Sequence, residues 1–243
     1  MTDDTILGGR VRLRQSTAGY RAGLDAALLA AACDAPDGAC VLDAGCGVGA
    51  VMLAAAARRP GTRFVGLERD ADAVALARAN VALNGWESRI DVRLGDVAAT
   101  FAALRLAPFD AVLANPPFFD DEAALRGPAE AKRGAWISAE GLQAWTLFLV
   151  KAVREGGTIT VIHRADRLAD LLAGLAPKAG SFQIRPVHPF ADAPAKRVLV
   201  RAVKTGRGPL RLLPPLVLHE RGGAKHTPGT EAILRGEAAL AWD

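Results

Sequence analysis

Four consecutive residues, Asn115-Pro116-Pro117-Phe118, combine hydrogen-bond acceptors with a stiff backbone and an aromatic ring. The side-chain oxygen of Asn115 and the backbone carbonyl of Pro116 can each accept one N–H, so together they could hold a planar NH2 group. The two prolines restrict the backbone and keep that carbonyl aimed. Phe118 offers a ring face on which a flat heterocycle can stack. The tetrapeptide therefore predicts chemistry on an amine conjugated to a ring or carbonyl, which needs orientation more than a strong base.

A second group of residues has the composition of a nucleotide-binding loop. Three glycines at alternate positions, Gly45, Gly47 and Gly49, let the backbone turn tightly and approach a ligand closely. Asp43 precedes the first glycine, and a helix is expected directly after the last one, which is the general device for holding nucleotides. Glu68 follows the next expected strand, where a carboxylate can accept hydrogen bonds from both hydroxyls of a ribose.

The elements that must position these residues alternate between strand and helix. Apolar strands without alternation, placed between helices, predict a mostly parallel sheet covered on both faces, and such sheets bind ligands beyond the carboxyl ends of their strands. Both groups of residues fall at such ends. We expect seven strands at 39–42, 63–67, 90–94, 109–114, 158–162, 182–187 and 198–203, and helices at 50–58, 70–83, 138–153 and 166–175.

Taken together, the two motifs resemble those of class I methyltransferases, which use S-adenosylmethionine. The Gly-x-Gly-x-Gly spacing after Asp43 is similar to their first motif, and Asn-Pro-Pro-Phe to the fourth motif of enzymes that methylate conjugated amines. The resemblance implies that the glycines, Asp43, Glu68 and Asn115 bind the cofactor. It also implies that Asp96 faces the adenine amino group, although Asp96 could merely cap the next turn. NAD is the alternative cofactor, but its enzymes use Gly-x-Gly-x-x-Gly.

A closer resemblance extends over nearly the whole chain. Residues 15–29 and the segment 213–236 are similar to the ends of the bacterial tRNA(Val) adenine-N6 methyltransferase family. The resemblance implies that Asp25 helps to close over the cofactor, and a surface position in the first turn of a helix is the alternative. It further implies that the substrate is adenine N6 in tRNA, near the anticodon, with Asn115, Pro116 and Phe118 as catalytic residues.

Other functions stay open at this point. A guanine-N2 enzyme acting on ribosomal RNA, a protein glutamine-N5 methyltransferase and a non-catalytic RNA-binding protein of the same fold are the alternatives. Glutamine enzymes carry an N-terminal helical domain, whereas only residues 1–38 precede the first expected strand. Intact Asp43, Glu68 and Asn115 argue against a protein without activity.

Composition and charge narrow the setting. With 51% hydrophobic and 23% charged residues the chain is globular rather than disordered. The N-terminus opens with acids rather than the basic stretch of a signal peptide, and no apolar run could span a bilayer, so we expect a cytoplasmic protein without membrane contact. Three cysteines without a Cys-x-x-Cys pair and four scattered histidines predict no metal site.

The net charge of +4 favours an acidic partner, which we expect to be RNA. The excess lies in residues 196–225, with eight Lys or Arg, and in Arg10, Arg12 and Arg14. Both clusters could bind phosphate or be ordinary solvated surface. The division expected is an N-terminal arm and helix at 1–38, a methyltransferase domain at 39–204 and a basic extension at 205–243. Residues 119–133 would form a lid beside the target pocket or a plain loop.

Overall fold

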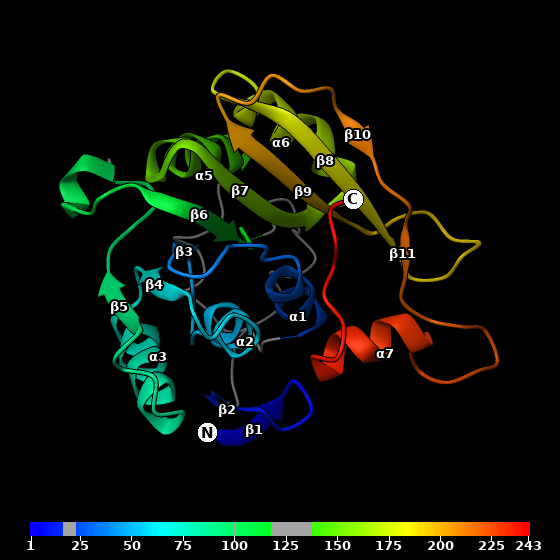
Figure 1. Ribbon diagram of the computed structural model, residues 1–243, viewed down its shortest axis with the longest axis horizontal. Coiled ribbons are helices and arrows are strands. Elements are labelled where there is room, and N and C mark those ends of the chain that lie inside the picture. The colour runs from blue at the N-terminus through cyan, green and yellow to red at the C-terminus, as the bar shows by residue number, and fades with distance from the viewer. Residues whose placement is uncertain (17–22, 100, 118–137) are drawn as a thin grey trace.

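The structure, a computed structural model, describes residues 1–16, 23–99, 101–117 and 138–243. Its centre is a twisted sheet with strand order β10-β8-β9-β7-β6-β3-β4-β5, and β11 pairs with β8 (Figure 1). Strand β9 runs antiparallel to both of its neighbours, while the pairs from β5 to β7 are parallel. The strands are β3 (Cys40–Ala44), β4 (Arg63–Glu68), β5 (Ile90–Leu94), β6 (Phe109–Ala114), β7 (Val153–Arg164), β8 (Ala179–His188), β9 (Arg197–Lys204), β10 (Arg211–Leu212) and β11 (Leu216–Val217).

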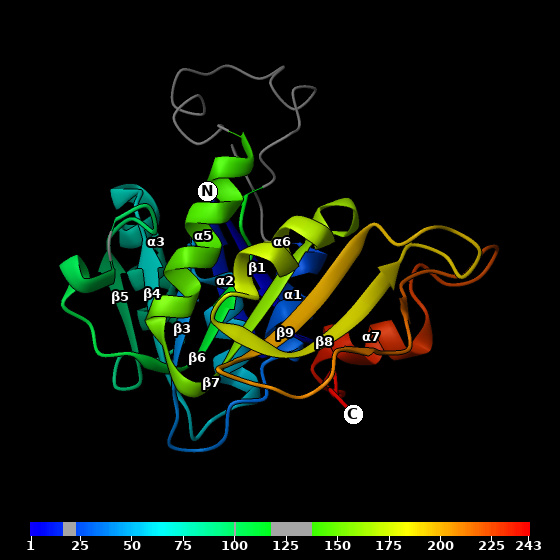
Figure 2. The same cartoon turned by 90° about the horizontal axis from the view of Figure 1, so that it is seen from above.

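Helices cover both faces of this sheet, as Figures 1 and 2 show. Helices α5 (Ser138–Ala152) and α6 (Leu168–Leu175) lie on one face, where Phe148 and Leu171 contribute to the apolar cluster. Helices α1 (Leu24–Ala31), α2 (Ala50–Arg58) and α3 (Ala71–Leu83) belong to the opposite face. The described residues also contain two short 3-10 turns, η1 (Phe101–Leu104) and η3 (Ala165–Arg167). The expected fold class, a sheet buried on both sides by helices, is confirmed.

An N-terminal hairpin packs on the outside of α2 and α3. Strands β1 (Thr2–Ile6) and β2 (Val11–Gln15) pair antiparallel and form a sheet of their own. Two side-chain amides bind the free edge of β2, one from Asn80 on α3 and one from Asn84, the C-cap residue of that helix. Asn80 accepts from the N–H of Arg14 at 2.8 Å and donates to its carbonyl at 2.9 Å, and Asn84 does the same for Arg12 at 2.9 and 2.7 Å.

The arginines of this hairpin hold it to the rest of the molecule. Arg10 donates to the carbonyls of Ala57 and Gly236, and Arg12 donates to the carbonyl of Leu83. Arg14 pairs with Asp3 at 2.7 Å. Of the two expectations for this basic cluster, the phosphate-binding surface is therefore the weaker, because its guanidinium groups are engaged within the chain.

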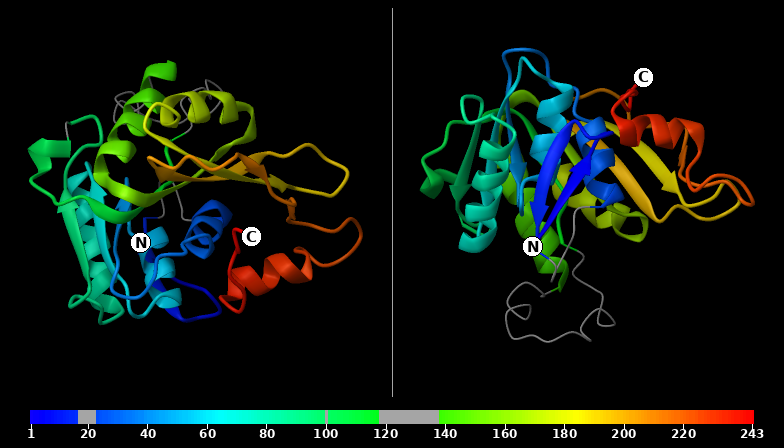
Figure 3. Two further views of the ribbon diagram at one scale, coloured as in Figure 1. Left: turned by 45° about the horizontal axis from the view of Figure 1, so that its top comes forward. Right: turned by 90° about the horizontal axis from the view of Figure 1, so that it is seen from below.

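The C-terminal segment returns to the α1 face. It contributes β10, β11 and α7 (Pro228–Arg235), and then a tail in which the buried Trp242 donates its indole N–H to the carbonyl of Ala32 at 2.9 Å. Figure 3 shows α7 and the tail beside α1. Thr227 caps α7 by accepting from the N–H of Thr230 at 3.2 Å.

The expected strands and helices within residues 39–204 are present, with ends that shift by a few residues. Two features differ from the sequence-based expectation. The N-terminal arm contains a hairpin, and β10 and β11 extend the sheet to nine strands. Strand β7 also begins earlier than the expected 158–162 and is irregular there, since the φ of +71° at Gly156 accompanies a register shift against β6.

Candidate functional site

The segment 45–49, which we call the glycine loop, and Asn115 directly follow two neighbouring strands of the sheet. Ala44, the last residue of β3, pairs in register with Ala114, the last residue of β6. Gly45 and Asn115 are the residues that follow, so they begin at the same carboxyl edge, about 5 Å apart by the spacing of paired strands. The two groups that the sequence singled out separately are therefore brought together by one pair of strands.

The backbone of the loop has a conformation that favours glycine at each of the three positions. The φ angles are +69° at Gly45, +54° at Gly47 and +92° at Gly49. A Cβ at Gly45 would come within 2.5 Å of the Trp145 ring on α5, whereas a Cβ at Gly47 would meet no atom within 4 Å. Gly45 is thus required by packing, and Gly47 faces open space where a ligand can approach the backbone.

The side chain of Asp43 connects the strand before the glycine loop to the helix after it. Its side chain is 1% exposed and accepts a hydrogen bond from the N–H of Met52, in the first turn of α2, at 3.0 Å. Burial raises the pKa of Asp43 to about 7, while the Met52 N–H opposes that rise and the charge of Glu68 adds to it. The carboxylate therefore fixes the start of α2 relative to β3, and the expected cofactor role would be exerted through the loop.

Glu68 closes the other side of the loop. One of its oxygens accepts from the N–H of Gly47 at 2.9 Å, and the other accepts from Arg69 and Asp70 N–H groups at 2.8 and 3.0 Å. These contacts hold a half-exposed carboxylate at the end of β4, next to the open space at Gly47. A ribose hydroxyl could bind there, so the residues present fit an adenosine-containing cofactor.

Asp96 and Asp25 lie further along the same edge. Asp96 follows β5 and accepts from the N–H of Ala98 at 2.9 Å, so the capping alternative describes its contact in the structure. Asp25 lies in the first turn of α1, and its carboxylate pairs with Arg197 at the start of β9 at 3.0 Å. The ion pair joins α1 to the sheet at its carboxyl edge.

Of the expected catalytic residues, Asn115 and Pro116 are described. Asn115 is half-buried and Pro116 is buried directly after β6. Phe118 and the expected lid at 119–133 lie outside the described residues. Tyr20 and most of the segment that resembles the tRNA methyltransferase family before α1 lie outside them as well.

His163 is a residue that the sequence analysis assigned to no function and that the structure places near Asn115. It follows Ile162 on β7, and Ala114 of β6 pairs in register with Val161, so His163 lies at the same carboxyl edge. The side chain is 2% exposed. Burial lowers its pKa to about 4, and the charges of Arg167, Arg164 and Arg197 lower it further, so the ring is neutral at pH 7. Its place at the end of an expected strand was the available signal.

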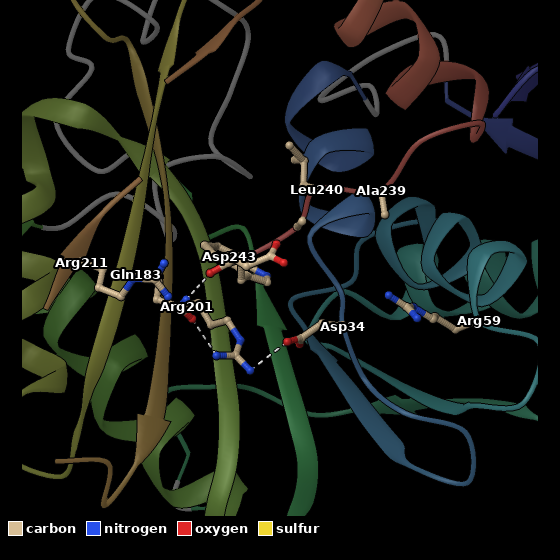
Figure 4. A pocket seen from close by; sticks show the side chains of 10 residues that line it. Asp34, Arg59, Gln183, Arg201, Arg211, Ala239, Leu240 and Asp243 are labelled. Carbon is tan, nitrogen blue, oxygen red and sulfur yellow. Dashed lines mark hydrogen bonds and ion pairs between the residues drawn. The ribbon is translucent and has the colours of Figure 1, made fainter. Parts of the chain in front are cut away.

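A cavity of about 500 Å³ opens elsewhere, between β8, β9 and the C-terminal tail (Figure 4). Arg201 crosses it, donating to Gln183 at 2.8 Å and pairing with Asp34 at 2.8 Å. Neither the glycine loop nor Asn115 lines this cavity. It is therefore separate from the site at the carboxyl edge.

The described residues contain no group of three or more His, Cys, Asp or Glu side chains that could hold a metal ion. No helix among them is both long and apolar enough to cross a bilayer.

A family model, the methyltransferase small domain, matches residues 21–129. The chain is 40% identical over 101 residues to a tRNA1(Val) (adenine(37)-N6)-methyltransferase of Phocaeicola vulgatus, covering 42% of each chain. It is 30% identical over 208 residues to the enzyme of the same name from Porphyromonas gingivalis, covering 82% of this chain and 80% of the relative.

Two further matches carry other names. A release factor glutamine methyltransferase of Chlorobaculum tepidum is 30% identical over 152 residues, which cover 59% of this chain and 52% of the relative. A crystal structure titled as a predicted O-methyltransferase from Agrobacterium tumefaciens superposes with a TM-score of 0.74 at 27% identity, covering 89% of this chain and 98% of that one. The chain thus spans about half the length of the first two curated relatives and most of the length of the third.

Proposed function

This chain belongs to the S-adenosylmethionine-dependent methyltransferase family that includes the tRNA1(Val) (adenine(37)-N6)-methyltransferases, and from that premise we propose that it methylates adenine N6 in tRNA, near the anticodon. The observation that carries the proposal is the register between Ala44 and Ala114. This register supports the proposal because it brings the glycine loop, which would bind the cofactor, next to the two acceptors that would bind the amine.

The acceptors are the side-chain oxygen of Asn115 and the backbone carbonyl of Pro116. Each accepts one N–H of the adenine amino group, which keeps the lone pair directed at the methyl donor and stabilises the positive charge that develops on nitrogen. S-adenosylmethionine, when bound, supplies an electrophilic methyl group. Phe118 stacks on the base. No strong base is required, because the amine becomes acidic only as the N–C bond forms.

The cofactor residues have divided roles in this proposal. Glu68 binds the ribose hydroxyls, Gly47 offers its backbone, and Asp96 faces the adenine amino group while capping its own turn. Asp43, Gly45 and Gly49 shape the loop, and Asp25 closes over the bound cofactor together with Arg197. The described contacts of Glu68 and Asp43 support this division, since one carboxylate is half-exposed and the other is buried.

The proposed substrate also implies a partner, a location and a division of the chain. We propose RNA as the macromolecular partner, the cytoplasm as the location, and the division into 1–38, 39–204 and 205–243 as the functional units. The similarity to release factor glutamine methyltransferases favours a second candidate, the side-chain amide of a protein glutamine. The same two acceptors would hold that NH2 group.

One experiment separates these candidates. The protein is incubated with isotopically labelled S-adenosylmethionine and either unmodified tRNA or a release factor, and the products are digested and analysed by mass spectrometry. We expect label in N6-methyladenosine from tRNA. Label in methylguanosine or only in the release factor would contradict the adenine assignment.

A further inference from the structure

The basic segment 196–225 does not form one surface. Strand β9 begins at Arg197, which pairs with Arg164 at the end of β7, and it ends at Lys204, which pairs with Ala179 at the start of β8. Lys196 and Arg197 therefore lie at the carboxyl edge of the sheet, and Lys204 lies at the opposite edge with Arg207 after it. The chain then returns along β10 and β11 to the carboxyl edge.

That return builds a compact group of rings at the carboxyl edge. Leu218 donates to the carbonyl of His188 at 2.9 Å, and His219 donates to that of Pro189 at 3.0 Å, so the segment after β11 lies against the loop after β8. Figures 2 and 3 show these two segments together at one end of the molecule. We call the group the edge cluster, and its members are Phe190, His219, Arg221 and His226.

The edge cluster brings four flat side chains into contact. The His219 and His226 rings stack at 5.1 Å and 27°, whereas the Phe190 and His219 rings, 5.6 Å apart, are tilted by 49°. The Arg221 guanidinium lies 4.3 Å from the centre of the Phe190 ring. Stacked aromatic rings flanked by guanidinium groups are the surfaces on which unpaired nucleic-acid bases stack.

Cations surround these planes. Lys196 and Lys225 are exposed, and the side chain of Arg221 is 64% exposed. Arg221 pairs through Nε with Asp192, at 3.0 Å, and the terminal nitrogens of its guanidinium have no hydrogen bond to the described residues. Because an ion pair this exposed contributes little stability, a phosphate can replace or join Asp192 at small cost.

The edge cluster and Asn115 share one edge of the sheet. Strands β6, β7, β9 and β8 are successive neighbours, so the end of β8 lies three strand spacings, about 14 Å, from the end of β6. Because each nucleotide of a stacked strand advances the chain by about 3.4 Å and an unstacked one can span more, roughly four nucleotides or fewer would bridge this distance.

We propose that the edge cluster, with Lys196 and Lys225, is a second RNA-contacting site that holds nucleotides flanking the target adenine. The proposal rests on the function proposed above and names where the substrate is held outside the amine site. A base stacks on the rings, and the lysines contact the adjoining phosphates.

The charge contribution is tested with a matched pair of double variants. K196Q/K225Q removes two cations at the carboxyl edge, and K178Q/R207Q removes two exposed cations at the opposite edge. Binding of unmodified tRNA is measured by fluorescence anisotropy at several salt concentrations, without cofactor. We expect the first variant to lower the slope of log affinity against log salt by about one to two, and the second to leave it unchanged.

The stacking contribution is tested with F190A. We expect its Kd for tRNA to rise about tenfold, its KM for tRNA to rise more than its kcat falls, and its Kd for S-adenosylmethionine to stay at the wild-type value. F190L, which keeps the apolar packing, controls for folding, and thermal unfolding of both variants is compared with wild type.

The outcomes separate this proposal from the one it rests on. If wild-type protein methylates tRNA while F190A and K196Q/K225Q bind it with unchanged affinity, the edge cluster is overturned and the proposed function stands. Equal losses in K196Q/K225Q and K178Q/R207Q overturn it as well. Wild-type protein that neither binds nor methylates RNA overturns both proposals.

Discussion

At the scale of single residues, the polar groups at the carboxyl edge of the sheet differ in their position and in how deeply their side chains are buried. Asn115 follows a strand whose neighbour ends in the glycine loop. Asp43 and His163 are each at most 2% exposed. Asp43 accepts from the N–H of Met52 and so acts on the start of α2. Asn115 is half-buried, and in the proposed function it is the polar side chain of the tetrapeptide that contacts the substrate.

Replacing Asn115 tests the proposed amine acceptor. N115A removes one of two acceptors, and we expect kcat for tRNA methylation to fall on the order of a hundredfold or more. The Kd for S-adenosylmethionine, measured by calorimetry, should change little. N115D keeps an acceptor oxygen and serves as the matched control, with activity above that of N115A. Near-wild-type turnover of N115A would show that another group holds the amine.

Two buried groups give opposite dependences of stability on pH. The Asp43 carboxyl keeps its proton to about pH 7 in the folded state but loses it near 3.8 in the unfolded chain, so its contribution to stability falls as pH rises through this window. The His163 ring has a pKa of about 4 folded and 6.5 unfolded, so its contribution rises between these values. Relative to wild type, D43N should therefore gain stability from about pH 4 to 7. H163Q should lose stability from about pH 4 to 6.5. Denaturant unfolding of each single variant across pH separates the two, and parallel curves would contradict both assignments.

At the scale of elements, the glycine loop is held by contacts with two helices, α5 and α2. Trp145 of α5 fills the space that a side chain at Gly45 would need, and Asp43 binds the first turn of α2. The loop is therefore held on two sides and open at Gly47. This contrast separates a residue needed for packing from one needed for ligand approach.

The pair G45A and G47A tests that contrast. Both substitutions strain a positive φ, but only G45A places a Cβ against the Trp145 ring, at 2.5 Å. We expect G45A to lower the free energy of unfolding more than G47A does, by about 1–3 kcal/mol for an overpacked site. G47A should chiefly weaken S-adenosylmethionine binding. The double variant G45A/W145L should recover part of the lost stability; equal unfolding midpoints for G45A and G47A would contradict the packing argument.

The sequence predicted the elements whose own residues determine them and missed those that depend on distant partners. The buried parallel strands are continuous apolar runs, and the helix expected at 70–83 is present as α3 with Asp70 as its N-cap. Strand β1 carries two adjacent acids and no apolar alternation. The free edge of β2 is paired by the amides of Asn80 on α3 and of its C-cap residue Asn84, and no local sequence pattern reveals this pairing. The basic run 196–225 could not be divided between two edges before the direction of β9 was known.

At the scale of the whole molecule, the two ends of the described chain converge on one face. Leu13 of the hairpin and Trp242 of the tail belong to the same apolar cluster as α1 and α2. Arg10 links the hairpin to the end of α7, and Arg185 donates to the carbonyl of Ala241 at 2.6 Å. The hairpin and the C-terminal tail, which have no proposed catalytic role, thus complete the apolar cluster that contains α1 and α2.

Substitutions of Trp242 measure how much the C-terminal tail contributes to the free energy of unfolding. W242A removes a buried indole and leaves the carbonyl of Ala32 without its donor, so we expect a loss of about 3–5 kcal/mol in unfolding free energy. W242F keeps most of the apolar volume and should lose less. Chemical denaturation of the two variants gives the difference, and an unchanged midpoint for W242A would show that the tail contributes nothing to the core.

Asn80 of α3 and Asn84, the C-cap residue of that helix, have a consequence for solubility. Residues four apart on a helix are separated by about 6 Å along its axis, and residues two apart on a strand by about 6.7 Å, so one helix can present amides in step with a strand's N–H and C=O groups. Asn80 and Asn84 thereby act as a surrogate neighbour for β2 and cover an edge that another molecule could otherwise extend. Removing both amides would bare that edge, and self-association detected by light scattering at concentrations where wild type stays monodisperse would reveal its loss.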